Sequence, residues 1–156
     1  MAGWDYWWHD LAVLVAAELD GLRWNQFLIV DYDLVRLRGA GLYAQASRQP
    51  SGYYCEVVSG EVLREHVWPF DPAALTRGGW CPPDASTSNW FLTGVPSALI
   101  AGGLLLRSLV EARGCDDPDL IFLTVGSHPP GGGGEPEPAA AKGPSRVAMP
   151  GERWAA

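Results

Sequence analysis

The sequence predicts an α+β domain in which an antiparallel sheet of about four strands is flanked by an N-terminal and a C-terminal helix. Two stretches with apolar residues at helical spacing lie near the two ends of residues 1–125, and short runs of β-forming residues separated by turn-like loops lie between them. Hydrophobic residues make up 47% of the 156 residues, which is enough for a substantial core. Together these features predict one domain that folds on its own.

The first helix is predicted to begin after Asp5, a capping residue, and to end at Gly21. Its apolar positions recur at helical spacing, so the following stripe is expected to face the core: Trp7, Trp8, Leu11, Leu14, Val15 and Leu19. Residues 27–32, FLIVDY, are rich in β-forming types and are expected to form the first strand.

A hairpin is predicted next, because residues 42–47 and 53–58 flank the turn-like sequence RQPSG. With the preceding strand, the hairpin predicts an antiparallel meander of three strands.

The length of the hairpin loop decides which side chains share a face. A four-residue loop at 48–51 places Tyr43 and Gln45 on the same face as Tyr54 and Glu56, and leaves the other face apolar. A five-residue loop would place Glu56 in the apolar row and bury a carboxylate, so the four-residue loop is favoured.

A short helix is predicted over residues 71–77, because its first residue is a capping aspartate followed by proline and because two glycines follow it. Beyond it, Pro82 and Pro83 predict a stiff structural corner. This corner is expected to hold Trp80 and Trp90 in the core so that helix and sheet pack together.

A fourth strand is predicted over residues 88–92, and a long helix is predicted to start at Pro96 and end at Gly114. The adjacent glycines at 102–103 indicate close packing or a bend within this helix. Residues 119–125 are expected to form an edge strand or to lie irregularly on the surface.

Residues 126–156 are predicted to form a disordered tail, separate from the domain of residues 1–125. Gly and Pro are far more frequent in this stretch than in the domain, and Val147 is its only branched aliphatic residue. Such a segment buries too little surface to offset its chain entropy.

The formal net charge of -7 argues against a nucleic-acid partner, because phosphate binding needs a clustered positive surface. Three cysteines are an odd number and favour reduced, mostly buried thiols over a disulfide framework. The longest uncharged apolar run, at positions 95–106, is well short of the ~20 residues needed to span a bilayer, and the first residues do not have the pattern of a secretory signal. We therefore expect a cytoplasmic protein with no membrane partner.

The sequence contains no recognisable catalytic or metal-binding motif. The best pair for thiol chemistry is Cys81 with His66, but no orienting acid stands beside them, so a buried structural Cys81 and a surface His66 are favoured. No spacing typical of a metal site occurs, and neither a metal nor a cofactor is expected.

The four polar and aromatic residues of the hairpin are a candidate peptide-binding platform. Tyrosine offers a large contact area with a polar tip, so Tyr43, Gln45, Tyr54 and Glu56 on one sheet face are suited to hold a peptide. An ordinary solvent-exposed sheet or a dimer contact remains an alternative.

The order of several short motifs resembles the TY-Chap families of actinobacterial proteins, which are named for similarity to type III secretion and YbjN chaperones. The motifs are a Tyr-x-Gln strand, a Tyr-Tyr-x-Glu-Val-Val strand, a Gly-Gly-Trp-x-Pro-Pro corner, an Asn-Trp pair and an alanine-led helix, within about residues 4–122. The resemblance implies an α+β fold with a helix-flanked antiparallel sheet, and a role in holding a peptide segment of a client protein. It leaves open whether a partner or client supplies a last element of the fold.

The leading hypothesis is therefore a non-enzymatic peptide-binding chaperone or adaptor whose client is a secreted effector or toxin. Its partner would be a client protein or peptide, with a homodimer left open. The alternatives are an immunity or scaffold protein that blocks one toxin and a small thiol-dependent enzyme.

Overall fold

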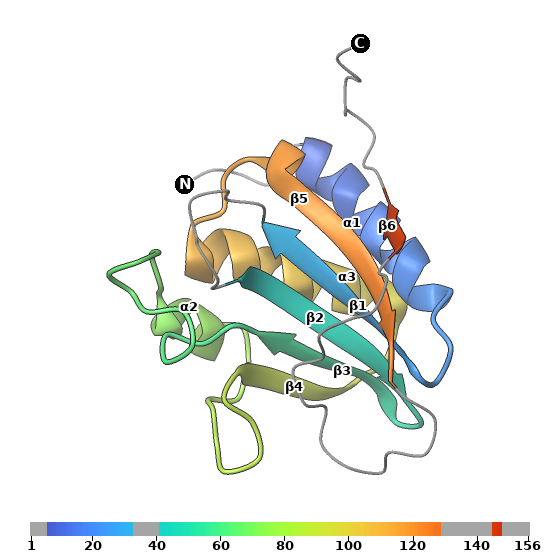
Figure 1. Ribbon diagram of the computed structural model, residues 1–156, viewed down its shortest axis with the longest axis horizontal. Helices are drawn as coiled ribbons and strands as arrows, with labels where there is room; N and C mark the ends of the chain where they lie inside the picture. Colours follow the sequence, from blue (N-terminus) through green and yellow to red (C-terminus); the bar gives the residue numbers. More distant parts are fainter. Residues whose placement is uncertain (1–5, 33–40, 129–144, 148–156) are drawn as a thin grey trace.

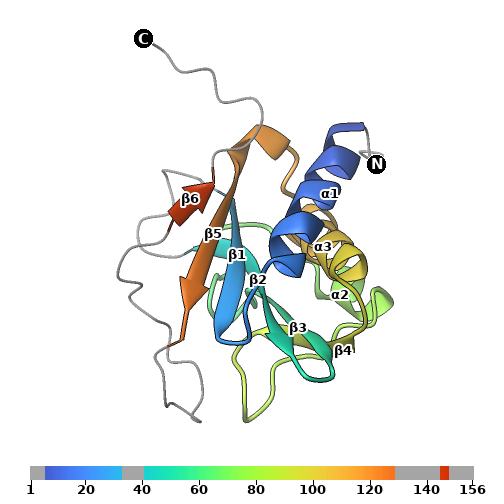
Figure 2. The same cartoon turned by 90° about the vertical axis from the view of Figure 1, so that its right-hand side faces the viewer.

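The computed structural model describes residues 6–32, 41–128 and 145–147. Its described part is one antiparallel sheet whose helices α1 and α3 lie side by side on one face, as Figures 1 and 2 show. The elements are α1 Tyr6–Asp20, β1 Gln26–Tyr32, β2 Leu42–Gln49, β3 Gly52–Val57, α2 Pro72–Arg77, β4 Trp90–Val95, α3 Ala98–Arg107, the π-helical turn η1 Ser108–Ala112, the short 3-10 helix η2 Pro118–Leu120, β5 Ile121–Ser127 and β6 Ser145–Val147.

The strand order in the sheet is β4-β3-β2-β1-β5-β6, and every pairing is antiparallel. Strands β1 to β4 form a meander, and the chain then crosses the sheet through α3 to add β5 beside β1. The predicted α+β class, antiparallel sheet and flanking helices are confirmed, with six strands in place of about four. The prediction for residues 119–125 named an edge strand or an irregular segment, whereas β5 lies inside the sheet.

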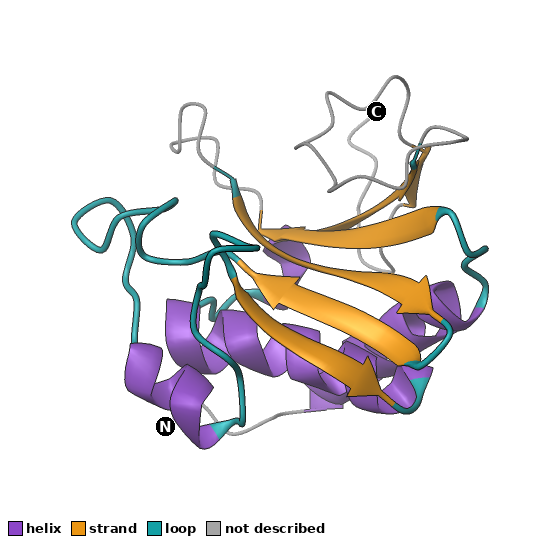
Figure 3. Cartoon of the chain, turned by 90° about the horizontal axis from the view of Figure 1, so that it is seen from below, coloured by secondary structure: helices purple, strands orange, loops and turns teal. Residues whose placement is uncertain are grey.

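The core lies between this sheet and the two helices (Figure 3). Trp8, Leu11, Val15 and Leu19 of α1 are buried there as predicted. The prediction for Trp7 is wrong, because 65% of its surface is exposed. Successive residues of a helix point about 100° apart, so the burial of Trp8 turns its neighbour away from the core.

The crossing of α1 and α3 depends on Gly102. A Cβ atom at this position would lie 3.1 Å from the backbone nitrogen of Ala16 and 3.2 Å from the carbonyl oxygen of Ala12. Gly103 has open space around it. Of the two glycines, Gly102 is therefore the one that close packing requires.

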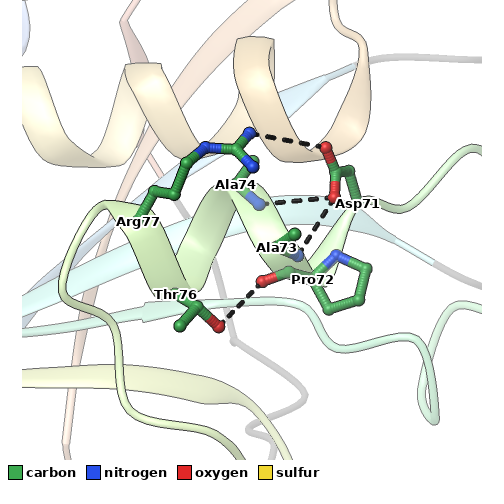
Figure 4. Close-up of polar contacts among 6 residues, drawn as sticks. All are labelled: Asp71, Pro72, Ala73, Ala74, Thr76 and Arg77. Carbon is green, nitrogen blue, oxygen red and sulfur yellow. Dashed lines mark hydrogen bonds and ion pairs between the residues drawn. The ribbon is translucent and has the colours of Figure 1, made fainter.

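Helix α2 starts as its sequence predicts (Figure 4). Asp71 Oδ1 accepts hydrogen bonds from the backbone N–H groups of Ala73, at 3.0 Å, and Ala74, at 3.3 Å, and Pro72 occupies the first turn. Arg77 forms an exposed ion pair with Asp71 at 3.7 Å, a contact of little energetic weight. Local signals were sufficient here because each partner lies within one helical turn.

The long helix begins slightly later than predicted, and a buried arginine follows its C-terminal end. Ser97 caps α3 by accepting from the N–H of Ile100 at 3.2 Å, so Pro96 precedes the cap and is not the first helical residue. At the other end Arg113 is fully buried, with its guanidinium 4.2 Å from the centre of the Phe70 ring.

The Arg113 guanidinium holds the segment between β3 and α2 against the helix layer. It donates to the carbonyl of Val58 at 2.7 and 3.2 Å, and to those of Leu63 at 3.1 Å and Pro69 at 3.4 Å. Burial lowers the pKa of Arg113 to about 10, which still leaves it charged at neutral pH. No feature of the sequence pattern indicated this role.

Candidate functional site

The sheet face opposite the helices carries the four residues that the sequence singled out. Gln45 lies opposite Glu56 and Ser47 lies opposite Tyr54 in the β2–β3 register, so Tyr43, Gln45, Tyr54 and Glu56 share this face. We call it the open face, since α1 and α3 cover the other side (Figure 2). The predicted assignment of the residues to the two faces is confirmed.

The predicted length of the hairpin loop is wrong. Gln49 pairs with Gly52, so the turn contains only the two residues at positions 50–51, in place of four. Gly52 adopts a positive φ of 124°, a conformation that favours glycine. The correction moves the pairing by two residues, and because side chains alternate with a period of two, every residue keeps its face.

Glu56 is the centre of a hydrogen-bonded group that we call the Glu56 cluster: Gln45, Tyr54, Glu56 and Thr87. The amide of Gln45 donates to Glu56 Oε2, while the hydroxyls of Tyr54 and Thr87 each donate to Glu56 Oε1 at 2.9 Å. Only 7% of the surface of Glu56 is exposed. The carboxylate is therefore stabilised by its own chain, and its first role is to orient the side chains around it.

Asn89 ties the segment before β4 to the same face. Its amide nitrogen donates to the hydroxyl of Tyr43 at 3.0 Å, its amide oxygen accepts from the N–H of Ser59 at 3.3 Å, and its own N–H donates to Thr87 Oγ1 at 3.2 Å. Asn89 is itself buried. The sequence analysis missed Thr87 and Asn89 as partners, because the segment that carries them is distant from β2 and β3 along the chain.

The tyrosines of this face are held in their protonated form. Burial raises the pKa of Tyr43, and burial followed by the neighbouring charge of Glu56 raises that of Tyr54. Both hydroxyls therefore remain hydrogen-bond donors at any physiological pH.

Aromatic side chains extend the open face on both sides of the Glu56 cluster. The rings of Tyr54 and Phe91 stack with centres 6.2 Å apart. On the other side, Phe122 of β5 pairs with Asp31 of β1, and both lie on the open face by the register. Apart from the buried Glu56, these side chains are half-buried, which leaves part of each ring surface accessible.

Within β1 to β5, the charged side chains of the open face are acidic. By the strand register it carries Asp31 and Glu56, and the described residues of β1 to β5 place no Lys or Arg on it. Arg48 turns to the other side, where it donates to the carbonyl of Leu22 at 3.2 Å and lies 5.2 Å from the centre of the Trp24 ring. The arrangement suits a basic or neutral polypeptide better than an acidic one.

The predicted structural corner joins α2 to the sheet. Trp80 and Trp90 are buried in the core, whereas Pro82 is exposed and Pro83 is half-buried. The backbone of Cys81 forms two hydrogen bonds with Phe91, of 2.9 and 3.0 Å, on the outer edge of β4.

The prediction of a buried Cys81 is wrong, because its backbone rather than its side chain makes the contact and the residue is exposed. His66 is exposed as expected. No described contact joins the thiol of Cys81 to the imidazole of His66, so the structure does not bring the proposed thiol pair together.

A small pocket lies between α2 and the end of α3. It has a volume of about 130 Å³, and the residues that line it include Leu75, Trp80 and Leu104. An ion pair of 3.9 Å between Arg107 and Glu111 lies at its rim. Ligand pockets for small molecules are typically larger, about 300 Å³ or more, so this one accommodates at most a single side chain.

None of the helices in the described ranges has the length and apolar character of a membrane span. Nor do three or more His, Cys, Asp or Glu side chains come together there as a group that could hold a metal ion.

The chain also matches the model of a known protein family. Residues 2–127 match the family TY-Chap3, described as T3SS (YopN, CesT) and YbjN peptide-binding chaperone 3. The matched region includes Tyr43, Gln45, Tyr54 and Glu56. Searches of curated proteins and of solved structures gave no match.

Proposed function

Because the chain belongs to the TY-Chap3 family of T3SS and YbjN peptide-binding chaperones, we propose that it holds a peptide segment of a client protein on the open face of its sheet. The role is non-enzymatic and cytoplasmic, and the client is a secreted effector or toxin. Family membership supports peptide binding in general, and the structure supports the choice of surface.

The observation that carries the proposal is the Glu56 cluster, which lies on the same sheet face as several half-buried aromatic rings. Three donors converge on one carboxylate and fix Gln45, Tyr54 and Thr87 in place before any client binds. A surface that is already ordered loses less side-chain entropy when a peptide covers it. Aromatic side chains with a polar tip are also the residue type that contributes most to binding at protein interfaces.

The client chemistry follows from shape and charge. A sheet face offers a continuous surface in place of a closed pocket, so it suits an extended segment or one face of a helix whose apolar side chains lie on Tyr43, Phe91 and Phe122. The chain has a net charge of -7, which attracts basic segments. We therefore propose a client segment that alternates apolar and basic residues.

A peptide selection tests this proposal. Ten-residue peptides selected from a random library on the full chain would be measured by fluorescence anisotropy against Ile29→Lys, a change on the half-buried centre of the open face. We expect a loss of affinity of about tenfold or more, because a lysine removes apolar contact and repels a basic peptide.

Val13→Lys is the matched control, because it places the same charge at a 49%-exposed site on α1, on the other side of the sheet. It should leave the affinity unchanged. Equal losses in both variants, or an unchanged affinity in Ile29→Lys with a native circular dichroism spectrum, would show that the open face is not the binding surface.

A further inference from the structure

The outer edge of β5 is paired with a strand of the same chain, β6, that is much shorter than β5. On its inner side β5 pairs with β1 along all seven residues, from Ile121 to Ser127. On its outer side only the three residues of β6 pair with it, as Leu123 with Val147, Thr124 with Arg146 and Val125 with Ser145. Figure 1 shows this short strand against the long arrow of β5.

The direction of the backbone groups can be assigned along this edge. The N–H of His128 donates to the carbonyl of Asn25, at 2.7 Å, on the β1 side. Backbone groups alternate in direction along a strand, so those of Thr124 also turn to β1, and those of Leu123 and Val125 turn outward to β6.

Beyond β6 the edge continues in both directions. By the same alternation, the carbonyl of Ile121 and both backbone groups of Ser127 point outward, and the described residues of β6 do not pair with them. An extended segment as long as β5 would pair with the whole edge, whereas β6 pairs with less than half of it. Unpaired backbone groups on an edge strand are a template for strand addition.

The chain itself shows that β6 is a tethered occupant. The positions 129–144 connect β5 to β6, and most of them are Gly or Pro. Because β6 belongs to the same chain as β5, it meets the edge at a high local concentration. A three-residue strand on such a tether can be displaced by a longer strand that forms more backbone hydrogen bonds.

The distribution of charge favours the pairing of β5 with β6 and also its pairing with a competing client segment. Residues 138–151 contain Lys142 and Arg146 and no acidic residue, while residues 1–125 contain 8 Arg against 15 Asp and Glu. The described strand β6 thus adds Arg146 to the edge of an acidic domain, and a basic client would be attracted in the same way.

We propose that the outer edge of β5 is a strand-addition site for an extended, basic client segment, and that the chain's own residues Ser145–Val147 hold this site until the client displaces them. The displacing segment rests on the proposed function, whereas self-occupancy of the edge does not. The open face and this edge are adjacent parts of one sheet, so a client backbone added at β5 continues the surface on which other parts of the client lie.

Amide hydrogen exchange on the full chain tests self-occupancy without any client. In Val147→Pro the residue loses the N–H that faces β5, whereas the matched control Val147→Thr keeps the N–H and the β-branched shape. The amides of Leu123 and Val125 should exchange about tenfold faster in Val147→Pro than in the wild type. The amide of Thr124, which faces β1, should remain protected in all three proteins and serves as the internal control.

A peptide with the sequence of residues 142–150, KGPSRVAMP, tests addition at the same edge. It should bind the full-length Val147→Pro variant about threefold or more tightly than the wild type, because the competing segment no longer occupies the site. Val147→Thr should bind it as the wild type does.

The outcomes separate the two proposals. Unchanged exchange of Leu123 and Val125 in Val147→Pro overturns self-occupancy, whatever the open-face variants show. Faster exchange with no gain in peptide affinity, or a Val147→Pro variant that dimerises through the freed edge and excludes the peptide, overturns strand addition by a client. Faster exchange together with tighter binding supports the proposal, even if Ile29→Lys leaves the affinity of library peptides unchanged.

Discussion

Exchanging the residues at positions 45 and 56 should preserve the stability of the chain, although one of the two single substitutions should lower it substantially. The Gln45 amide donates to Glu56 Oε2, and the hydroxyls of Tyr54 and Thr87 donate to Glu56 Oε1. In Gln45→Glu two carboxylates face each other at a site where Glu56 is only 7% exposed. In the double variant Gln45→Glu/Glu56→Gln, the new glutamine can donate to the new glutamate and still accept from both hydroxyls.

The magnitudes follow from the number and kind of hydrogen bonds. Gln45→Glu loses one hydrogen bond to a charged group, worth about 1.5–3 kcal/mol, and adds repulsion, so we expect a loss of about 2–3 kcal/mol in the free energy of unfolding. Glu56→Gln keeps both hydroxyl donors, and Gln45 can turn its amide to accept from the new residue. This single variant should therefore lose only about 0.5–1 kcal/mol. The double variant should lie within about 1 kcal/mol of the wild type.

Urea unfolding followed by tryptophan fluorescence measures all four proteins, since the chain has eight tryptophans. The decisive quantity is the coupling free energy between positions 45 and 56, which should reach about 1.5 kcal/mol or more. Additive effects of the two substitutions, or a Gln45→Glu variant as stable as the wild type at pH 7, would refute the assignment of the Glu56 cluster.

Three more predictions concern the described core and its thiols. Gly102→Ala should lower the melting temperature, because its Cβ would meet the backbone of α1 at 3.1 Å, whereas Gly103→Ala should stabilise the helix by about 1 kcal/mol; a common response would contradict the crossing. A thiol reagent should modify Cys81 alone in the folded chain and all three cysteines after unfolding, and modification of two or three thiols in the folded chain would contradict the burial of the others. Burial raises the pKa of Tyr32 to about 12 from an ordinary value near 10, so the folded state keeps its proton longer than the unfolded state does. The resulting stability is present below pH 10 and is lost as the pH rises from 10 to 12. Over this range the free energy of unfolding of the wild type should fall by about 1.4 kcal/mol per pH unit relative to that of Tyr32→Phe. Parallel profiles of unfolding free energy against pH for the two proteins would count against this.

The sequence was sufficient wherever the interactions are local. A capping aspartate followed by proline predicted the start of α2, and the apolar spacing of residues 11, 15 and 19 predicted the buried side of α1. The two faces of the hairpin were also predictable, although the loop is two residues shorter than expected. Side chains alternate along a strand, so an error of two residues leaves the faces unchanged.

The sequence predicted which residues make up the candidate site, but it did not predict their hydrogen-bond partners. Tyr43, Gln45, Tyr54 and Glu56 lie on one face as predicted, and their role in peptide binding stays a proposal. Their hydrogen-bond partners were not predictable, because Thr87 approaches Glu56 only when the segment before β4 folds over the sheet.

By itself, the sequence determined the succession of elements from α1 to α3, most of the buried side of α1, the two faces of the hairpin and the acidic charge of the chain, because each depends on neighbouring residues or on composition. Only the tertiary structure decided that β5 pairs with β1, that Arg113 donates to carbonyls in a distant part of the chain, and that the exposed thiol is the one at the corner. These contacts join segments far apart in the chain, and their free energy depends on the packing of the whole core, which no local pattern of residues encodes.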